Sequence, residues 1–265
     1  MKYPFNYLVE ISFLGFRFHG WQKQKNVKTL HDIVDKTLSF VFKESVYKTL
    51  GIGRTDAMVS ATNYYFQLFT DAPIDEKGFL VDFYKNAPQD LSINSVEKLP
   101  DNFDLLNCDK VKEYHYYFSF DEVYHPFAAP FITNVKAHLD IDLMKLGANF
   151  FEGEHYFHKY CTKPSVNTIF KREIKSCEIV DNTDFTASFF PIKSYVLKVK
   201  GKGFLRYQIR LMMAMLFELG KGNVKLDDIK NSLSKENDRK FLRTIAPASG
   251  LQLFNIDIHI KKGLQ

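Results

Sequence analysis

The sequence contains few of the residues that build disulfide frameworks and metal sites. Its 265 residues include three cysteines, which are widely separated and form no C-x-x-C pair and no Cys/His metal-ligand spacing. Scattered cysteines in odd number do not make a disulfide framework, so we expect three reduced thiols in an intracellular protein. No apolar run approaches the roughly 18 residues of a membrane span, and the N-terminal segment resembles a strand rather than a signal peptide. We therefore predict a soluble, cytoplasmic protein without a membrane partner.

Tryptophan is also scarce, although aromatic residues as a whole are abundant. The chain has one Trp but 26 Phe and 14 Tyr, and 45% of its residues are hydrophobic. Because phenylalanine favours strands and cores, we interpret this content first as buried sheet and second as stacking surface for bases. The formal net charge of +5 is compatible with an anionic partner. Many basic proteins bind no nucleic acid, so the charge alone identifies no partner.

The apolar pattern predicts an α+β chain in two halves. Period-two patterns predict strands over residues 3–13, 45–50, 63–70, 92–99, 113–120, 172–180, 194–202 and 251–260. Helical spacing and capping signals predict helices over residues 29–41, 74–85, 141–151, 204–219 and 225–233. Neither a repeat nor a low-complexity linker marks the boundary between the halves. We place it in the polar stretch 101–112, which gives domains 1–105 and 106–265.

One loop between two predicted strands combines glycines with charged residues. It consists of Gly51-Ile52-Gly53-Arg54-Thr55-Asp56-Ala57, in which two glycines allow a tight turn and an arginine stands two residues before an aspartate. A neighbouring positive charge keeps a carboxylate ionised at neutral pH, and a nucleophilic carboxylate must be ionised. From the spacing alone, however, a surface turn with a local ion pair is the better interpretation.

Four further segments accompany this loop along the chain. They are F-H-G-W-Q-K-Q at residues 18–24, K-E-Y-H-Y at 112–116, the stretch from Phe204 to Arg210, and A-P-A-S-G-L at 246–251. With the G-R-T-D-A of residues 53–57 they resemble five motifs of the TruA family of tRNA pseudouridine synthases, in the family's order. The matches span almost the whole chain, and five ordered motifs are hard to obtain by chance.

The resemblance implies a fold and a reaction. The pseudouridine synthase fold is α+β, with two similar ferredoxin-like halves joined by a continuous, mostly antiparallel sheet around a central cleft. In this family an aspartate, here Asp56, attacks a target uridine, the glycosidic bond breaks, and the uracil rotates and rejoins through C5. No metal or cofactor takes part. The usual targets are uridines at positions 38–40 of the tRNA anticodon stem-loop, and family members commonly form homodimers.

The resemblance also assigns roles to residues far from the loop. Tyr114 would lie against the target base and handle the C5 proton, and Arg210 would pair with Asp56. The residues alone leave alternatives open, namely a strand tyrosine with its ring in the core and an arginine on a helix surface. A charge in a mostly apolar helix is nevertheless more often paired. The other implied substrate contacts are Arg54, Thr55 and Leu251, of which the leucine is equally plausible as a core residue.

Basic and aromatic residues supply candidate RNA contacts. The loop after the first predicted strand provides His19, Trp21, Gln22 and Lys23. Lys198 and Lys200 alternate on one predicted strand and so point to one face, and Arg206 precedes Arg210 by one turn of the predicted helix. Such residues suit phosphate contacts, which position RNA without reading its sequence. For the lysines, a solvated strand face is an equally good interpretation.

The chain departs from the family pattern beside these motifs. Met58 and Ser60 stand where the family has Gly and His in A-G-V-H-A. Residues 103–107 are F-D-L-L-N instead of F-H-A-R-F, and residues 13–15 lack the family's Tyr-Asp-Gly. Our leading hypothesis is a synthase that modifies uridines 38–40 of the tRNA anticodon stem-loop with Asp56 as the nucleophile. The alternative is a relative that is catalytically silent and only binds RNA, or that modifies another RNA or position. The joint presence of the three catalytic candidates opposes the silent relative, and the changed RNA-contact positions motivate a changed substrate.

Overall fold

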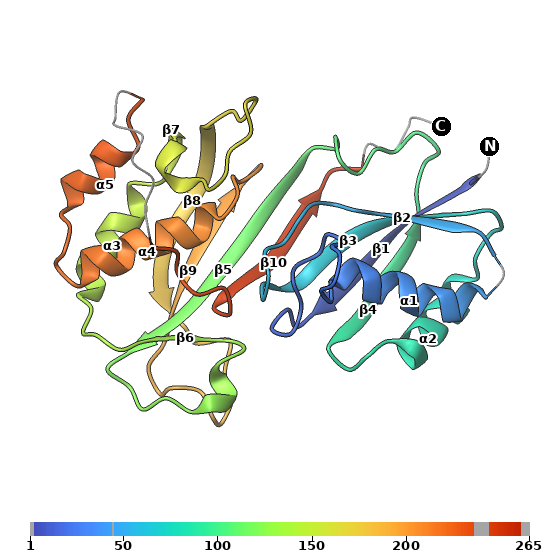
Figure 1. The fold of residues 1–265 in the computed structure, drawn as a ribbon, viewed down its shortest axis with the longest axis horizontal. Helices are drawn as coiled ribbons and strands as arrows, with labels where there is room; N and C mark the ends of the chain where they lie inside the picture. Colours follow the sequence, from blue (N-terminus) through green and yellow to red (C-terminus); the bar gives the residue numbers. More distant parts are fainter. Residues whose placement is uncertain (1–2, 44, 236–243, 261–265) are drawn as a thin grey trace. The chain divides into compact units, whose positions relative to one another are not determined.

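The computed structural model describes residues 3–43, 45–235 and 244–260, and the chain divides into two compact units (Figure 1). Unit 1 contains the chain up to Lys110 and the last strand from Leu253 onward, and unit 2 runs from Val111 to Gln252. The chain therefore passes between the units twice, the second time within its last strand. The expected boundary lay after residue 105 and kept the last strand with the second half.

Unit 1 combines a layer of antiparallel strands with two helices. The strands are β1 (Phe5–Phe13), β2 (Tyr47–Gly51), β3 (Ser60–Thr70), β4 (Leu91–Lys98) and β10 (Leu251–Ile258). Their order is β4-β1-β3-β10, with β2 also paired to β3. Helix α1 (Leu30–Phe42) contacts α2 (Glu76–Asn86), and the two also contact β2 and β4 respectively.

The core of unit 1 is formed by buried side chains of both the strands and the helices. They include Val9 on β1, Val34 and Leu38 on α1, and Phe83 on α2, each of which is 0% exposed. Val34 and Leu38 are four residues apart and therefore lie on one face of α1. The apolar face that the helical spacing predicted is thus the face that is buried.

The start of α1 follows from the side chains of its first turn. Thr29 is the N-cap, and its Oγ1 accepts a hydrogen bond from the backbone N–H of Asp32 at 3.4 Å. The Thr29 hydroxyl also donates to the Asp32 carboxylate at 2.5 Å. The first of these bonds satisfies a backbone N–H that the first turn of a helix leaves without a partner. The helix start that the sequence predicted at Thr29 is therefore confirmed.

Unit 2 has the same two kinds of layer. Its strands are β5 (Lys110–Phe120), β6 (Thr133–Val135), β7 (Gly153–Tyr156), β8 (Lys171–Asp181) and β9 (Tyr195–Gly201). The order is β5-β9-β8-β7 with antiparallel pairs, and β6 pairs with β5 in parallel. Two short 3-10 helices cover Pro126–Ala128 and His158–Tyr160.

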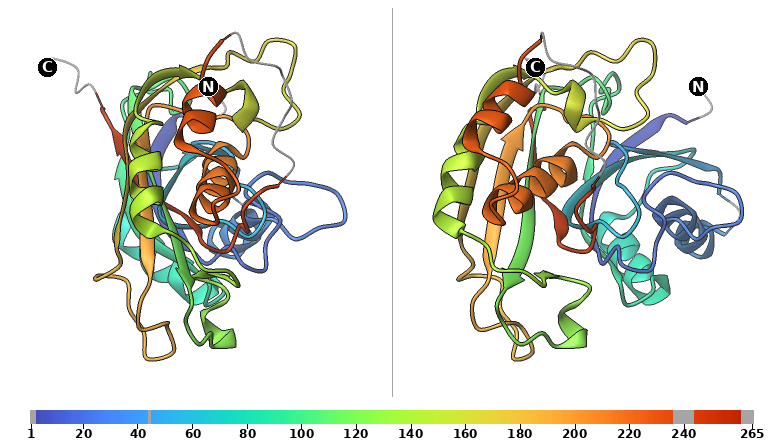
Figure 2. Two further views of the ribbon diagram at one scale, coloured as in Figure 1. Left: turned by 90° about the vertical axis from the view of Figure 1, so that its left-hand side faces the viewer. Right: turned by 60° about the vertical axis from the view of Figure 1, so that its left-hand side comes forward.

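In the described part of unit 2, helices pack against one another and against the sheet (Figure 2). Helix α3 (Ile141–Asn149) contacts β8, α4 (Gln208–Gly220) and α5 (Leu226–Ser232). Helix α4 is buried along most of its length. The rings of Tyr116 and Phe118 on β5 meet the ring of Phe217 on α4 at centroid distances of 6.1 and 5.5 Å. Alternate residues of β5 thus face the helix, as the period of a strand requires.

The α+β class is confirmed, and the differences from the expected elements are local. Strands β6 and β7 were not predicted, since three or four residues are too few to show a period. The late helix begins at Gln208 rather than near Phe204, because Tyr207 has a φ of 63° and left-handed backbone cannot belong to a right-handed helix. Among residues 3–43, 45–235 and 244–260, no helix is long and apolar enough to cross a membrane.

Candidate active site

The loop that carries Asp56 connects β2 to β3 in unit 1. Because these strands are antiparallel neighbours, the ladder closes the base of the loop, and the N–H of Ile52 continues it with a bond of 3.0 Å to the carbonyl of Tyr65. Within the loop, the N–H of Val59 donates to the carbonyl of Asp56 at 3.3 Å. Asp56 is half-buried and Arg54 is exposed. The carboxylate therefore lies on a short loop whose two ends are fixed by the sheet.

The F-H-G-W-Q-K-Q segment packs directly against this loop. The N–H of Met58 donates to the carbonyl of Phe18 at 2.9 Å. Gly20 has a φ of +80°, and a Cβ at this position would overlap the carbonyl oxygen of Thr55. Only glycine suits both the backbone conformation and the close approach. The Thr55 hydroxyl is buried and has no hydrogen-bond partner among the described residues. Two of the five motifs therefore meet within unit 1.

The structure gives a physical account of the departures after Asp56. Met58 has a φ of 67°, a region that glycine enters freely and other residues rarely adopt. This backbone conformation therefore favours the glycine of the family pattern, and Met58 adopts the same conformation at a cost in free energy. Ser60 is buried, and its Oγ accepts the N–H of Gly15 at 2.9 Å. The serine therefore connects the start of β3 to the loop that follows β1.

Trp21 lies in the core of unit 1 rather than on its surface. Its side chain is 2% exposed, and its ring stacks on His31 at 5.1 Å and meets Tyr64 at 4.2 Å. A buried indole has no face available for a nucleobase, so its place argues for support of the loop rather than contact with RNA. By contrast, His19 and Gln22 are exposed.

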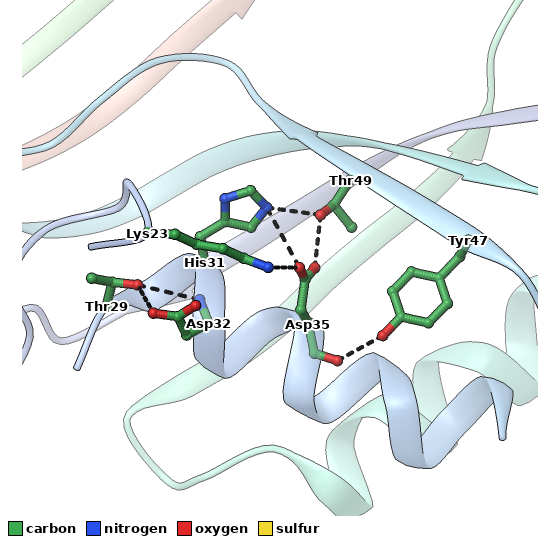
Figure 3. A network of polar contacts seen from close by, with 7 residues as sticks. All are labelled: Lys23, Thr29, His31, Asp32, Asp35, Tyr47 and Thr49. Atoms are coloured by element: carbon green, nitrogen blue, oxygen red, sulfur yellow. Dashed lines mark hydrogen bonds and ion pairs between the residues drawn. The ribbon is translucent and has the colours of Figure 1, made fainter. Parts of the chain in front are cut away.

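Lys23 belongs to a network on α1 that Figure 3 shows. Its ammonium group pairs with the carboxylate of Asp35. The same carboxylate accepts the hydroxyl of Thr49 at 2.7 Å, and Thr49 Oγ1 lies 2.8 Å from Nε2 of His31. Burial lowers the pKa of His31 below its usual value, which favours the neutral ring. Lys23 is exposed but already has a carboxylate partner.

Tyr114 lies on β5 in unit 2 and is half-buried. Its ring and that of Phe204 meet edge to face, with centroids 5.3 Å apart and planes at 87°. Along β5, Tyr114 shares its face with Tyr116, which is in the core, and it pairs across the ladder with Val199. The tyrosine therefore lies where this face of β5 passes from fully buried to partly exposed.

Arg210 stands in the first turn of α4 and is half-buried. Its Nε–H donates to the carbonyl of Ala246 at 2.7 Å, and its guanidinium lies 4.9 Å from the ring centre of Tyr207. Burial raises the pKa of Tyr116, and the nearby positive charge of Arg210 acts in the opposite direction. These contacts contradict the interpretation of Arg210 as a free arginine on the helix surface.

The three motifs of unit 2 converge around Arg210. The hydroxyl of Tyr116 donates to the carbonyl of Pro247 at 2.8 Å, and the N–H of Tyr117 donates to the carbonyl of Gly250 at 2.8 Å. The K-E-Y-H-Y strand, the start of α4 and the A-P-A-S-G-L segment are therefore neighbours. Leu251 follows directly and is 4% exposed, so most of its surface is already covered.

The remaining RNA-contact candidates lie on two surfaces of unit 2. Lys200 pairs with Glu113 at 3.2 Å, and Lys198 faces His115 across the ladder. On the other side of β9, Lys198 is the ladder partner of Glu178, so an acidic residue neighbours each lysine. Arg206 is exposed, with its guanidinium 5.3 Å from the ring centre of Tyr207. Because α4 begins after Tyr207, the expected helical turn between Arg206 and Arg210 does not exist.

The cysteines lie in the part of the chain that the structure describes. Cys108, Cys161 and Cys177 are free thiols, and burial raises the pKa of Cys161 and Cys177, which disfavours the reactive thiolate. The described residues contain no group of three or more His, Cys, Asp or Glu side chains that could hold a metal ion. Sequence reasoning missed Tyr64, whose contacts with the loop depend on tertiary structure.

The α+β fold carries five ordered motifs, with a loop aspartate in one unit and a tyrosine and an arginine in the other, which is typical of RNA pseudouridine synthases. A family model described as tRNA pseudouridine synthase matches residues 148–257. The tRNA pseudouridine synthase A of Dictyoglomus thermophilum is 32% identical over 261 residues, covering 95% of this chain and 99% of that protein. The protein of the same name from Listeria monocytogenes serotype 4a is 28% identical, with 95% and 98% covered. The chain therefore belongs to the TruA family of tRNA pseudouridine synthases.

Proposed function

We propose that this protein isomerises uridine to pseudouridine in tRNA, at positions 38–40 of the anticodon stem-loop, with Asp56 as the nucleophile. The observation that carries the proposal is the placement of Asp56. It lies on a G-R-T-D-A loop whose ends are fixed by the β2–β3 ladder and whose middle packs against the F-H-G-W-Q-K-Q segment. A nucleophile that must meet one atom of a flipped nucleotide needs such fixed geometry.

The reaction is an isomerisation, so bonds and protons balance within the substrate. The Asp56 carboxylate attacks the target uridine and forms a bond to it, and the bond from C1′ to N1 breaks. The uracil then turns so that C5 bonds to C1′, and the bond to Asp56 breaks again, which restores the free carboxylate. C5 then loses its proton and N1 gains one. We assign the positioning of the base and the handling of the C5 proton to Tyr114. From the resemblance to the family, we assign to Arg210 the role of pairing with the nucleophile.

RNA must be opened for this chemistry, because a stacked uracil is inaccessible. We assign substrate contacts to Arg54, Thr55 and Leu251, and phosphate contacts to His19, Gln22, Lys23, Lys198, Lys200 and Arg206. Trp21 acts through the loop that it supports, since its ring is buried. Contacts to phosphates should make binding salt-dependent.

The test is release of tritium from tRNA labelled at C5 of uridine. We expect release by the wild-type protein and none by Asp56→Ala, with tRNA affinity retained. Asp101→Ala is the matched control, because Asp101 is an exposed aspartate of the same unit outside the loop. Release that survives Asp56→Ala would refute the assignment of the nucleophile, and tRNA binding without release by the wild type would favour the silent relative.

One observation indicates that the contacts with the RNA substrate differ from those of the family pattern. Against the family's F-H-A-R-F, Leu106 stands in place of the Arg and Asp104 in place of the His. Asp104 is exposed, and its carboxylate accepts the N–H groups of Leu106 and Asn107 at 2.9 and 3.2 Å. Hydrogen bonds from Asn107 lower the pKa of Asp104, so it is negatively charged at neutral pH. A synthase acting on another RNA or position is therefore the second candidate, and a modification map of total RNA with and without the protein distinguishes the two.

We also propose that the protein acts in the cytoplasm as a homodimer with tRNA lying across both subunits. The three free thiols support a reducing compartment, and the family's common assembly supports the dimer. Light scattering of the purified protein tests the dimer, because a monomeric mass at assay concentrations would contradict it.

A further inference from the structure

Tyr64 contacts the loop that carries Asp56 from within unit 1. It stands on β3 with 1% of its surface exposed. Its hydroxyl donates a hydrogen bond of 2.6 Å to the carbonyl of Gly53, the first residue of the G-R-T-D-A sequence. Tyr64 is buried, so breaking this hydrogen bond would cost free energy. The bond therefore fixes the distance between β3 and the loop.

The ring of Tyr64 is itself held by neighbouring aromatic rings. Trp21 meets it at 4.2 Å with planes at 32°, and the rings of Tyr64 and Phe13 meet edge to face at 5.7 Å. A Cβ added to Gly51 would overlap both the indole nitrogen of Trp21 and the hydroxyl of Tyr64. The two polar atoms thus lie directly against the backbone where β2 passes into the loop.

His31 completes this arrangement on the other side of Trp21. The two rings stack at 5.1 Å with planes at 15°. Nε2 of His31 lies 2.8 Å from the hydroxyl of Thr49, which donates to Asp35 (Figure 3). Since Thr49 uses its proton for Asp35, the His31 Nε2–H is the donor to Thr49. The imidazole is therefore fixed between α1 and β2, the strand that leads into the loop.

We propose that Trp21, His31 and Tyr64, called here the aromatic support, are positioning residues for Asp56. The inference rests on the proposed function, in which Asp56 is the nucleophile. The support holds the Gly53 carbonyl through the Tyr64 hydroxyl, and the stacked rings keep that hydroxyl in place. Small displacements of a reacting group reduce rates strongly, by up to about 100-fold for 1 Å. The aromatic support thus acts on the rate of reaction and not on RNA affinity.

The decisive variant is Tyr64→Phe, which removes the hydroxyl and keeps the ring. The matched control is Tyr65→Phe, because the neighbouring tyrosine is half-buried and has its own hydrogen bond, to Glu10. We expect Tyr64→Phe to lower the single-turnover rate of tritium release about tenfold, as the loss of one buried hydrogen bond predicts. Its Kd for tRNA should stay within about twofold of the wild-type value, and Tyr65→Phe should keep the wild-type rate.

Hydrogen exchange supplies a readout that needs no activity. In the Tyr64→Phe protein, the amides of Met58 and Val59 should exchange faster, while those of α2 stay protected. If the wild type releases no tritium, the proposed function fails, and loop exchange still tests the support. The inference would be overturned if Tyr64→Phe changed neither the rate of tritium release nor the exchange of the loop amides. It would also be overturned if Tyr64→Phe and Tyr65→Phe changed these quantities equally, or if amide exchange in Tyr64→Phe rose uniformly across unit 1.

Discussion

Removal of the Ser60 hydroxyl should destabilise unit 1 by a measurable amount. Ser60 Oγ accepts the N–H of Gly15 at 2.9 Å, and both residues are buried. In Ser60→Ala this N–H loses its acceptor. A Cβ on Gly15 would overlap the Val59 carbonyl, so the site is closely packed and leaves little space for a replacing water.

The magnitude follows from the burial of the donor. An unsatisfied buried N–H costs about 1–3 kcal/mol, and the small cavity left by one oxygen adds little. We therefore expect a loss of about 1–2 kcal/mol in the free energy of unfolding, which corresponds to a fall in Tm of roughly 4–8 °C for a unit of this size.

Urea unfolding followed by circular dichroism measures this change. Ser39→Ala is the control, since the Ser39 hydroxyl donates to the Lys36 carbonyl on the exposed surface of α1 and alanine favours a helix. Ser60→Thr retains a hydroxyl and should recover part of the lost stability. A loss below about 0.5 kcal/mol in Ser60→Ala, or an equal loss in Ser39→Ala, would refute the reasoning.

Three further predictions concern residues around the motifs of the two units. Arg210→Lys should reduce tritium release at least tenfold, because lysine has no Nε–H in the position that donates to the Ala246 carbonyl. Gly51→Ala should destabilise the protein by about 1–3 kcal/mol in urea unfolding, since the added methyl overlaps the Tyr64 hydroxyl. The pKa of His31 is lowered in the folded state, so the unfolded state binds more protons and stability falls as pH drops below about 6.5. His31→Gln should make this acid dependence shallower in urea titrations between about pH 5 and 8.

Sequence patterns predicted the elements whose signals are local. The capping residue Thr29 and the alternation along β5 specify structure within a few residues, and both helix and strand occur where expected. The start of α4 was displaced because Tyr207 adopts left-handed backbone, which no propensity of tyrosine indicates. Trp21 was assigned to the RNA surface from its place in a motif, but it is buried against rings that include Tyr64, which is distant in sequence.

The departures from the family pattern are easier to interpret with these contacts. Met58 and Ser60 flank the same stretch of backbone, and each has a partner in the loop after β1: the N–H of Met58 meets the Phe18 carbonyl, and the Ser60 hydroxyl meets the Gly15 N–H. The positive φ of Met58 costs free energy that glycine would not lose, yet the backbone bond to Phe18 and the Ser60 bond to Gly15 are both made. The altered residues therefore preserve the loop that presents Asp56. A relative that had lost its activity would not need that geometry, so the retained packing favours a working synthase over a silent relative.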